Sequence, residues 1–157
     1  MRIYIPATGV DIGRDALLPR TVHAVTDELR DLLPGDVEEV LEAVAMNAAT
    51  DESLRVLAAL AASGETVYPL RVVIAAEIEE KKTARIEGDD ILPTAFQLVE
   101  PVGWEDVVSF HVDDAEAAND VVLAIGGDAA ALERVTDDED LMWFDVEERG
   151  RLIEYFG

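Results

Sequence analysis

Alternation of apolar and polar residues marks several strands along the chain. Residues 2–7 (Arg-Ile-Tyr-Ile-Pro-Ala) alternate β-branched and aromatic side chains up to a proline, and residues 21–26 have a strand-like composition. Residues 107–112 alternate as well, with Phe110 on the apolar face and His111 on the less apolar one. These patterns predict three strands that each bury one face.

Three further segments are predicted to be strands from apolar runs. Residues 70–76 are almost continuously apolar, which is typical of a central strand covered on both faces. Residues 95–99 and the aromatic segment 141–144 are shorter. Residues 79–93 are charged and contain Gly88-Asp89-Asp90, so we expect an exposed connection there.

Helix N-termini are indicated by side chains that can accept hydrogen bonds from a first turn. Thr26 precedes two acidic residues, which is the pattern of an N-cap. Asp113 with Glu116, and Asp145 with Glu148, have the spacing of a capping box. We therefore expect three helices to begin at these positions.

The longest helical pattern lies between residues 36 and 64. Asp36 and Glu39 have capping-box spacing, and apolar residues follow at helical intervals. A second N-cap at Thr50 or Asp51 and a stop at Gly64 leave two interpretations, either two helices or one bent helix. Both interpretations present an alanine-rich face suited to close packing.

The order of these elements predicts an α+β protein in which a mixed β-sheet carries helices mainly on one face. A ferredoxin-like arrangement is the candidate topology. Half of the residues are hydrophobic, which is enough for a real core, and neither a repeat nor a composition break divides the chain. We expect one domain over residues 1–157.

The charge of the chain excludes several classes of ligand. There are 35 acidic and 12 basic side chains, giving a formal net charge of −23, so the field of the protein repels nucleic acid and anionic membranes. There is no cysteine, which excludes disulfides, thiolate metal sites and a cysteine nucleophile. The sequence shows neither a signal-peptide pattern nor an apolar run long enough to span a membrane, so we expect a cytoplasmic location.

The candidate metal ligands are His23, His111 and Asp113. Histidine combined with carboxylate binds Zn²⁺, Mn²⁺ or Fe²⁺, and His111 and Asp113 share a strand face. Such a site requires strand 21–26 to neighbour strand 107–112. The structural interpretation is favoured, because Asp113 already fits the role of a helix N-cap.

Other candidate chemistry is weaker. The acidic run 137–140 lacks the spacing of a calcium-binding EF-hand loop, which favours a solvated turn, and no nucleophile elbow or phosphate-binding loop is present. Trp104 and Trp143 are expected in the core rather than in a pocket. The sequence therefore predicts no cofactor.

Five segments carry a likeness to a known group of proteins. They are residues 1–8 (MRIYIPAT), 23–26 (HAVT), 71–76 (RVVIAA), 110–114 (FHVDD) and 141–144 (LMWF). Together they resemble an uncharacterised family of small actinobacterial proteins, a domain of unknown function, nearly from end to end. The resemblance implies a cytoplasmic single domain without an assigned activity, so no catalytic residue can be carried over.

Three functional hypotheses follow. The leading one is a soluble, acidic protein-binding or regulatory module, rather than an enzyme, that meets a protein partner through its acidic surface. The alternative is a divalent-metal-dependent, hydrolase-like enzyme in which His23, His111 and Asp113 hold the ion. The third is a homodimer formed through the alanine-rich helices.

Overall fold

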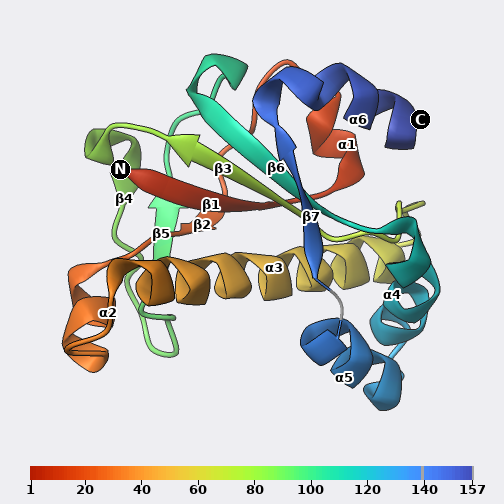
Figure 1. Ribbon diagram of the computed structural model, residues 1–157, viewed down its shortest axis with the longest axis horizontal. Coiled ribbons are helices and arrows are strands. Elements are labelled where there is room, and N and C mark those ends of the chain that lie inside the picture. Colours follow the sequence, from red (N-terminus) through yellow and green to blue (C-terminus); the bar gives the residue numbers. More distant parts are fainter. Residues whose placement is uncertain (139, 157) are drawn as a thin grey trace.

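A computed structural model describes residues 1–138 and 140–156 and contains a seven-stranded sheet of order β4-β5-β2-β1-β3-β6-β7 (Figure 1). Every pairing between neighbouring strands is antiparallel. The strands are β1 (Arg2–Ala7), β2 (Thr21–His23), β3 (Val72–Glu77), β4 (Thr83–Ala84), β5 (Ala95–Leu98), β6 (Val107–Asp113) and β7 (Leu141–Asp145).

The helices form layers on both faces of the sheet. Figure 1 shows α3 running across one face, with α1 and α6 on the other. The helices are α1 (Gly9–Ile12), α2 (Asp27–Leu32), α3 (Glu38–Ala62), α4 (Ala118–Ile125), α5 (Ala129–Asp138) and α6 (Arg149–Phe156). No helix of the described residues is long and apolar enough to cross a membrane.

The predicted α+β class is confirmed, whereas the expectation of a mixed sheet is wrong. β2 and β3 run in the same direction, and the chain between them forms α2 and α3, as in a parallel crossover. However, β1 lies between these two strands, so each strand keeps antiparallel neighbours. The ferredoxin-like topology stays a prediction.

The larger core lies between the sheet and the layer of α1 and α6. The predicted central strand is confirmed, since β3 lies between β1 and β6 and is buried over its first five residues. Side chains from β1, β3 and β6 meet those of the two helices; they include Ile3, Ile5, Ile12, Ile74, Phe110, Leu152 and Phe156. The two helices therefore bury the central strands on this face of the sheet.

On the opposite face, α3 is one helix of 25 residues, which settles the choice left open by the sequence. Thr50 does not start a second helix, because its hydroxyl donates to the carbonyl of Met46 at 2.8 Å within the same helix. The predicted Asp36–Glu39 capping box is also wrong, since α3 begins at Glu38 after Val37.

Strand β6 departs from simple alternation. Ala75 pairs with Ser109 and Ala76 pairs with Val107, so Val108 is an extra residue in a β-bulge. As a result Val107, rather than Val108, is buried in the core with Phe110. The predicted strand 21–26 is also shorter than expected, because β2 ends at His23.

The side-chain caps are partly as predicted. Thr26 accepts a hydrogen bond from the amide of Leu29 and begins α2, as expected. Asp145 accepts from the amide of Glu147 and begins the 3₁₀ turn before α6.

In the acidic run 137–140, Asp138 ends α5, while residue 139 lies outside the described residues.

Candidate functional site

The alanine-rich face of α3 leaves parts of the sheet uncovered. Ala45 and Ala49 are buried against Tyr4, Val73 and Ala75, so the face suggested for dimer contact is used inside the chain. A helix is about 10–12 Å wide and strands are about 4.8 Å apart, so one helix covers about two strands. Cavities lie on both sides of α3, one over β6 and β7 and one beside β2 and β5.

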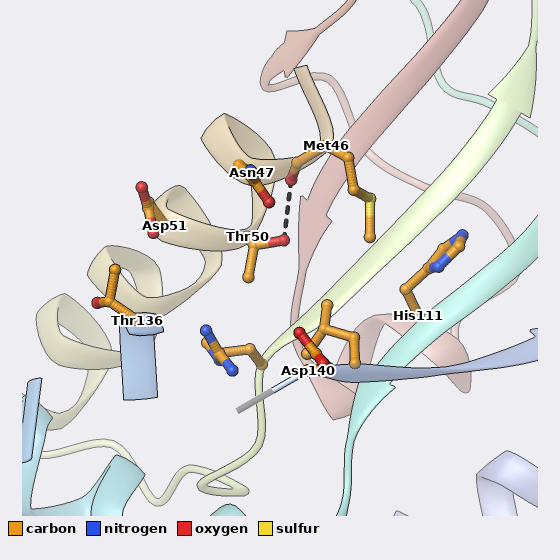
Figure 2. A pocket seen from close by; sticks show the side chains of 9 residues that line it. Met46, Asn47, Thr50, Asp51, His111, Thr136 and Asp140 are labelled. Atoms are coloured by element: carbon orange, nitrogen blue, oxygen red, sulfur yellow. Dashed lines mark hydrogen bonds between the residues drawn. The ribbon is translucent and has the colours of Figure 1, made fainter. Parts of the chain in front are cut away.

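The first cavity has a volume of about 500 Å³ and lies between α3, α5 and the start of β7 (Figure 2). It is lined mostly by polar side chains. Those are Asn47, Thr50, Asp51, Arg71, His111, Thr136 and Asp140, with Met46 and Leu141 as apolar contributors. Together with Trp143, we call these residues the β7 surface.

Trp143 continues the wall of this cavity along the sheet. It pairs directly with His111 across β6 and β7, so the two side chains share the face on which α3 lies. Trp143 is 61% exposed, so the expectation that it lies in the core is wrong. A large aromatic side chain is therefore mostly exposed to solvent at the end of the sheet.

The basic side chain in this cavity is already neutralised by a carboxylate. Arg71 and Asp113 are both buried, and the guanidinium forms a bidentate pair with the carboxylate through Nε–Oδ2 and Nη2–Oδ1 distances of 2.9 and 2.8 Å. The backbone amide of Arg71 also donates to Asp113 Oδ2 at 2.7 Å. The exposed carboxylates of Asp51 and Asp140 therefore make the cavity acidic.

His111 adds no positive charge at neutral pH. Burial lowers the pKa of His111 below its ordinary value of 6.5, and the charge of Arg2 lowers that pKa further. Its Nε2 lies 3.0 Å from the hydroxyl of Ser109, which holds the ring on the strand. His111 is thus a neutral, polar part of the wall.

His23 lies on the other side of α3 and is fully buried. Its Nδ1 is 2.8 Å from the hydroxyl of the buried Thr94, and its Nε2 is 3.4 Å from Oε2 of Glu52. Among the described residues Nε2 has no hydrogen-bond partner, because the contact with Glu52 lacks the required geometry. The imidazole, with Glu52, lines a second cavity of about 440 Å³.

The three predicted metal ligands do not come together. β2 and β6 are separated by β1 and β3, which places His23 and His111 about 14 Å apart at three strand spacings. Asp113 pairs with Arg71 and is not the predicted N-cap, since Asp114 accepts from the amide of Glu116. Over residues 1–138 and 140–156 no group of three or more His, Cys, Asp or Glu side chains could hold a metal ion.

The contacts of His23 have the connectivity of a catalytic triad, but the hydroxyl at the end of the series is not exposed to the cavity. Glu52, His23 and Thr94 follow one another as carboxylate, imidazole and hydroxyl. Thr94 is buried and does not line the cavity, so its hydroxyl cannot reach a substrate there.

Sequence reasoning did not single out Glu52, and it did not predict that the side chain of Trp143 is exposed. Glu52 would have been found from a continuous helix, because Ala45, Ala49 and Ser53 follow one another at intervals of four and place Glu52 at the rim of that stripe. No sequence signal separates an aromatic residue on a terminal strand from one in the core.

The chain belongs to the family of unknown function DUF6912, which it matches over residues 1–153. This agrees with the uncharacterised family that the sequence resembles. No curated protein and no solved structure matches the chain.

Proposed function

We propose that the protein is a binding module that takes a basic, extended segment of a partner protein at the β7 surface. The observation that carries the proposal is the end of the sheet at β7, where an exposed Trp143 lies beside an acidic cavity. Partners bind such strands by adding a strand of their own through backbone hydrogen bonds.

The strand itself suits this mode of binding. β7 pairs with β6 along one side, and in the described chain no strand pairs with its other side. It is five residues long and its sequence, Leu-Met-Trp-Phe-Asp, is apolar and aromatic. Backbone groups along the unpaired side are therefore available to a second strand.

The charge of the cavity selects the side chains of the partner. Asp51 and Asp140 are exposed, while Arg71 is neutralised by Asp113 and His111 is neutral. A Lys or Arg of an added strand would replace water beside these carboxylates. A segment that alternates basic and other residues would place every second side chain on this face.

The rest of the surface supports a basic partner. Counting only carboxylates of the described residues, ten of the 12 basic side chains lie within 4 Å of a carboxylate of the chain itself. The excess of acidic side chains therefore faces solvent and steers positively charged partners toward the molecule. Electrostatic steering raises the association rate rather than fixing the position of the partner.

The proposal is tested by fluorescence anisotropy with a labelled peptide of alternating Lys and Thr residues at low salt. We expect saturable binding that weakens but persists at moderate salt, and no binding of the matching Glu–Thr peptide. A Lys–Thr peptide N-methylated at every residue keeps its charge but has no amide N–H group on either edge to donate to a neighbouring strand. Equal binding of this peptide would refute strand addition.

A pair of charge variants locates the site. Asp140→Asn removes a carboxylate of the β7 surface and should weaken Lys–Thr peptide binding several-fold. Glu28→Gln removes one exposed carboxylate from α2, at the other end of the molecule (Figure 1), and should leave binding unchanged. Equal effects of the two variants would mean that only net charge matters.

A further inference from the structure

The cavity at His23 is lined by an imidazole whose Nε2 atom is buried and lacks a hydrogen-bond partner among the described residues. Nε2 of His23 has no hydrogen-bond partner among the described residues, although the side chain is fully buried. Leaving a buried polar group without a partner costs free energy, so such atoms mark functional groups or sites of missing ligands. The cavity lies on the side of α3 away from the β7 surface, so this inference does not rest on the proposed function.

The hydrogen bond at Nδ1 limits what Nε2 can do. If the ring proton is on Nδ1, it is donated to the hydroxyl of Thr94, and Nε2 presents a lone pair. That lone pair then lies 3.4 Å from a carboxylate oxygen of Glu52. Nε2 of His23 and the carboxylate oxygen of Glu52 are then two neighbouring acceptors, and a cationic donor that forms hydrogen bonds with both would stabilise them.

The charges around the cavity favour a single positive charge. Glu52 and Asp90 each contribute a carboxylate, and Arg55 contributes one guanidinium, whose Nη2 lies 3.9 Å from Glu52. Glu52, Asp90 and Arg55 together give these cavity walls a net charge of one negative unit. A monovalent cation therefore balances it.

The remaining walls favour an organic cation over a metal ion. Ile86, Ile91 and Leu92 line the same cavity, and Ile91 and Leu92 are exposed apolar side chains. A hydrocarbon chain would cover this apolar surface, whereas a hydrated metal ion would not. The volume of about 440 Å³ lies within the range of small-molecule sites.

We infer that the His23 cavity binds an aliphatic ammonium ligand. The ammonium group donates hydrogen bonds to Nε2 of His23 and to the carboxylate of Glu52, and its hydrocarbon part lies against Ile91 and Leu92. The ligand class is thus a small primary amine in its protonated form.

The experiment is NMR of ¹⁵N-histidine-labelled protein titrated with n-butylammonium chloride. The chain has two histidines, so His111, on the other side of α3, is an internal control, and a His111→Gln variant assigns the signals. We expect saturable shifts at the ring nitrogens of His23, with the proton on Nδ1, and none at His111.

Adjacent residues of α3 supply matched variants. Glu52→Gln should weaken n-butylammonium binding by about tenfold, because a hydrogen bond to a charged group is lost. Asp51→Asn removes a carboxylate that faces the other cavity and should leave binding unchanged. Equal weakening by both variants would overturn the inference.

Control ligands separate the contribution of the ammonium charge from that of the hydrocarbon chain. 1-Butanol has the same hydrocarbon chain without charge, and ZnCl₂ and MgCl₂ supply cations without hydrocarbon. Saturable shifts at His23 with 1-butanol equal to those with n-butylammonium would refute recognition of the ammonium group. Shifts with a metal ion but none with n-butylammonium would make the site a metal site and overturn the inference.

Discussion

The two ends of the sheet differ in length and in the side chains around them. β4 has two residues, and the two lysines of the chain, Lys81 and Lys82, directly precede it. β7 has five residues, carries Trp143 and has no lysine nearby in sequence. Short strands and lysines are common means by which proteins keep a sheet end from pairing with other chains.

The β4 end thus has two features that discourage pairing with other chains, a short strand and nearby lysines, and the β7 end lacks both. The overall excess of acid cannot explain the difference, because both ends belong to the same acidic chain. Protection of β4 and not of β7 is the pattern expected if pairing at β7 is useful. If so, substitutions at the β7 end and at the β4 end should differ in their effects on stability and on peptide binding.

The largest effect is expected at the ion pair that anchors the β7 side of the sheet. Asp113→Asn removes the buried carboxylate that accepts three hydrogen bonds from Arg71 and should lower the free energy of unfolding by about 3–5 kcal/mol. Near β4, Lys82 lies 3.8 Å from a partly exposed Asp106, so Lys82→Met should cost no more than about 1 kcal/mol. Chemical denaturation measures both; similar losses would contradict the difference in anchoring.

A single substitution should make the β7 end resemble the β4 end. Trp143→Lys places a positive charge on the exposed strand, and Trp143 packs little in the fold, so the free energy of unfolding should change by less than about 0.5 kcal/mol. Binding of the Lys–Thr peptide should weaken by at least about tenfold. Anisotropy measures binding, and unchanged affinity would show that the peptide binds elsewhere.

The smallest effect concerns pH. Because burial holds the pKa of His111 below 6.5, the folded protein binds fewer protons at this site than the unfolded chain. The contribution of neutral His111 is thus complete above 6.5 and is lost as pH falls from 6.5 through its folded pKa. His111→Gln should reduce the loss of stability between about pH 7.5 and about pH 5.5. An equal loss in both proteins would show that His111 has no such role.

Much of the fold could be predicted from local patterns. The apolar run at residues 70–76 predicted a central strand, and Thr26 predicted the start of α2. Local patterns misplaced elements where a tertiary contact took precedence. Asp113 has the spacing of an N-cap, yet it pairs with Arg71, 42 residues away, and Asp114 takes the cap.

The candidate site was less predictable, because it depends on strand order. The sequence identified His23 and His111 as residues of interest, but only the order of strands shows that β1 and β3 separate them. Likewise, the aromatic composition of residues 141–144 predicted a strand correctly, whereas its position at the end of the sheet left Trp143 exposed.

The measurement that tests the central claim most directly is residue-resolved amide hydrogen exchange with and without the Lys–Thr peptide. The account predicts that the peptide slows exchange at amides of β7 that lack a partner in β6 and leaves the amides of β4 unchanged. Peptide binding without slower exchange in β7, or with equal slowing in β4, would contradict it.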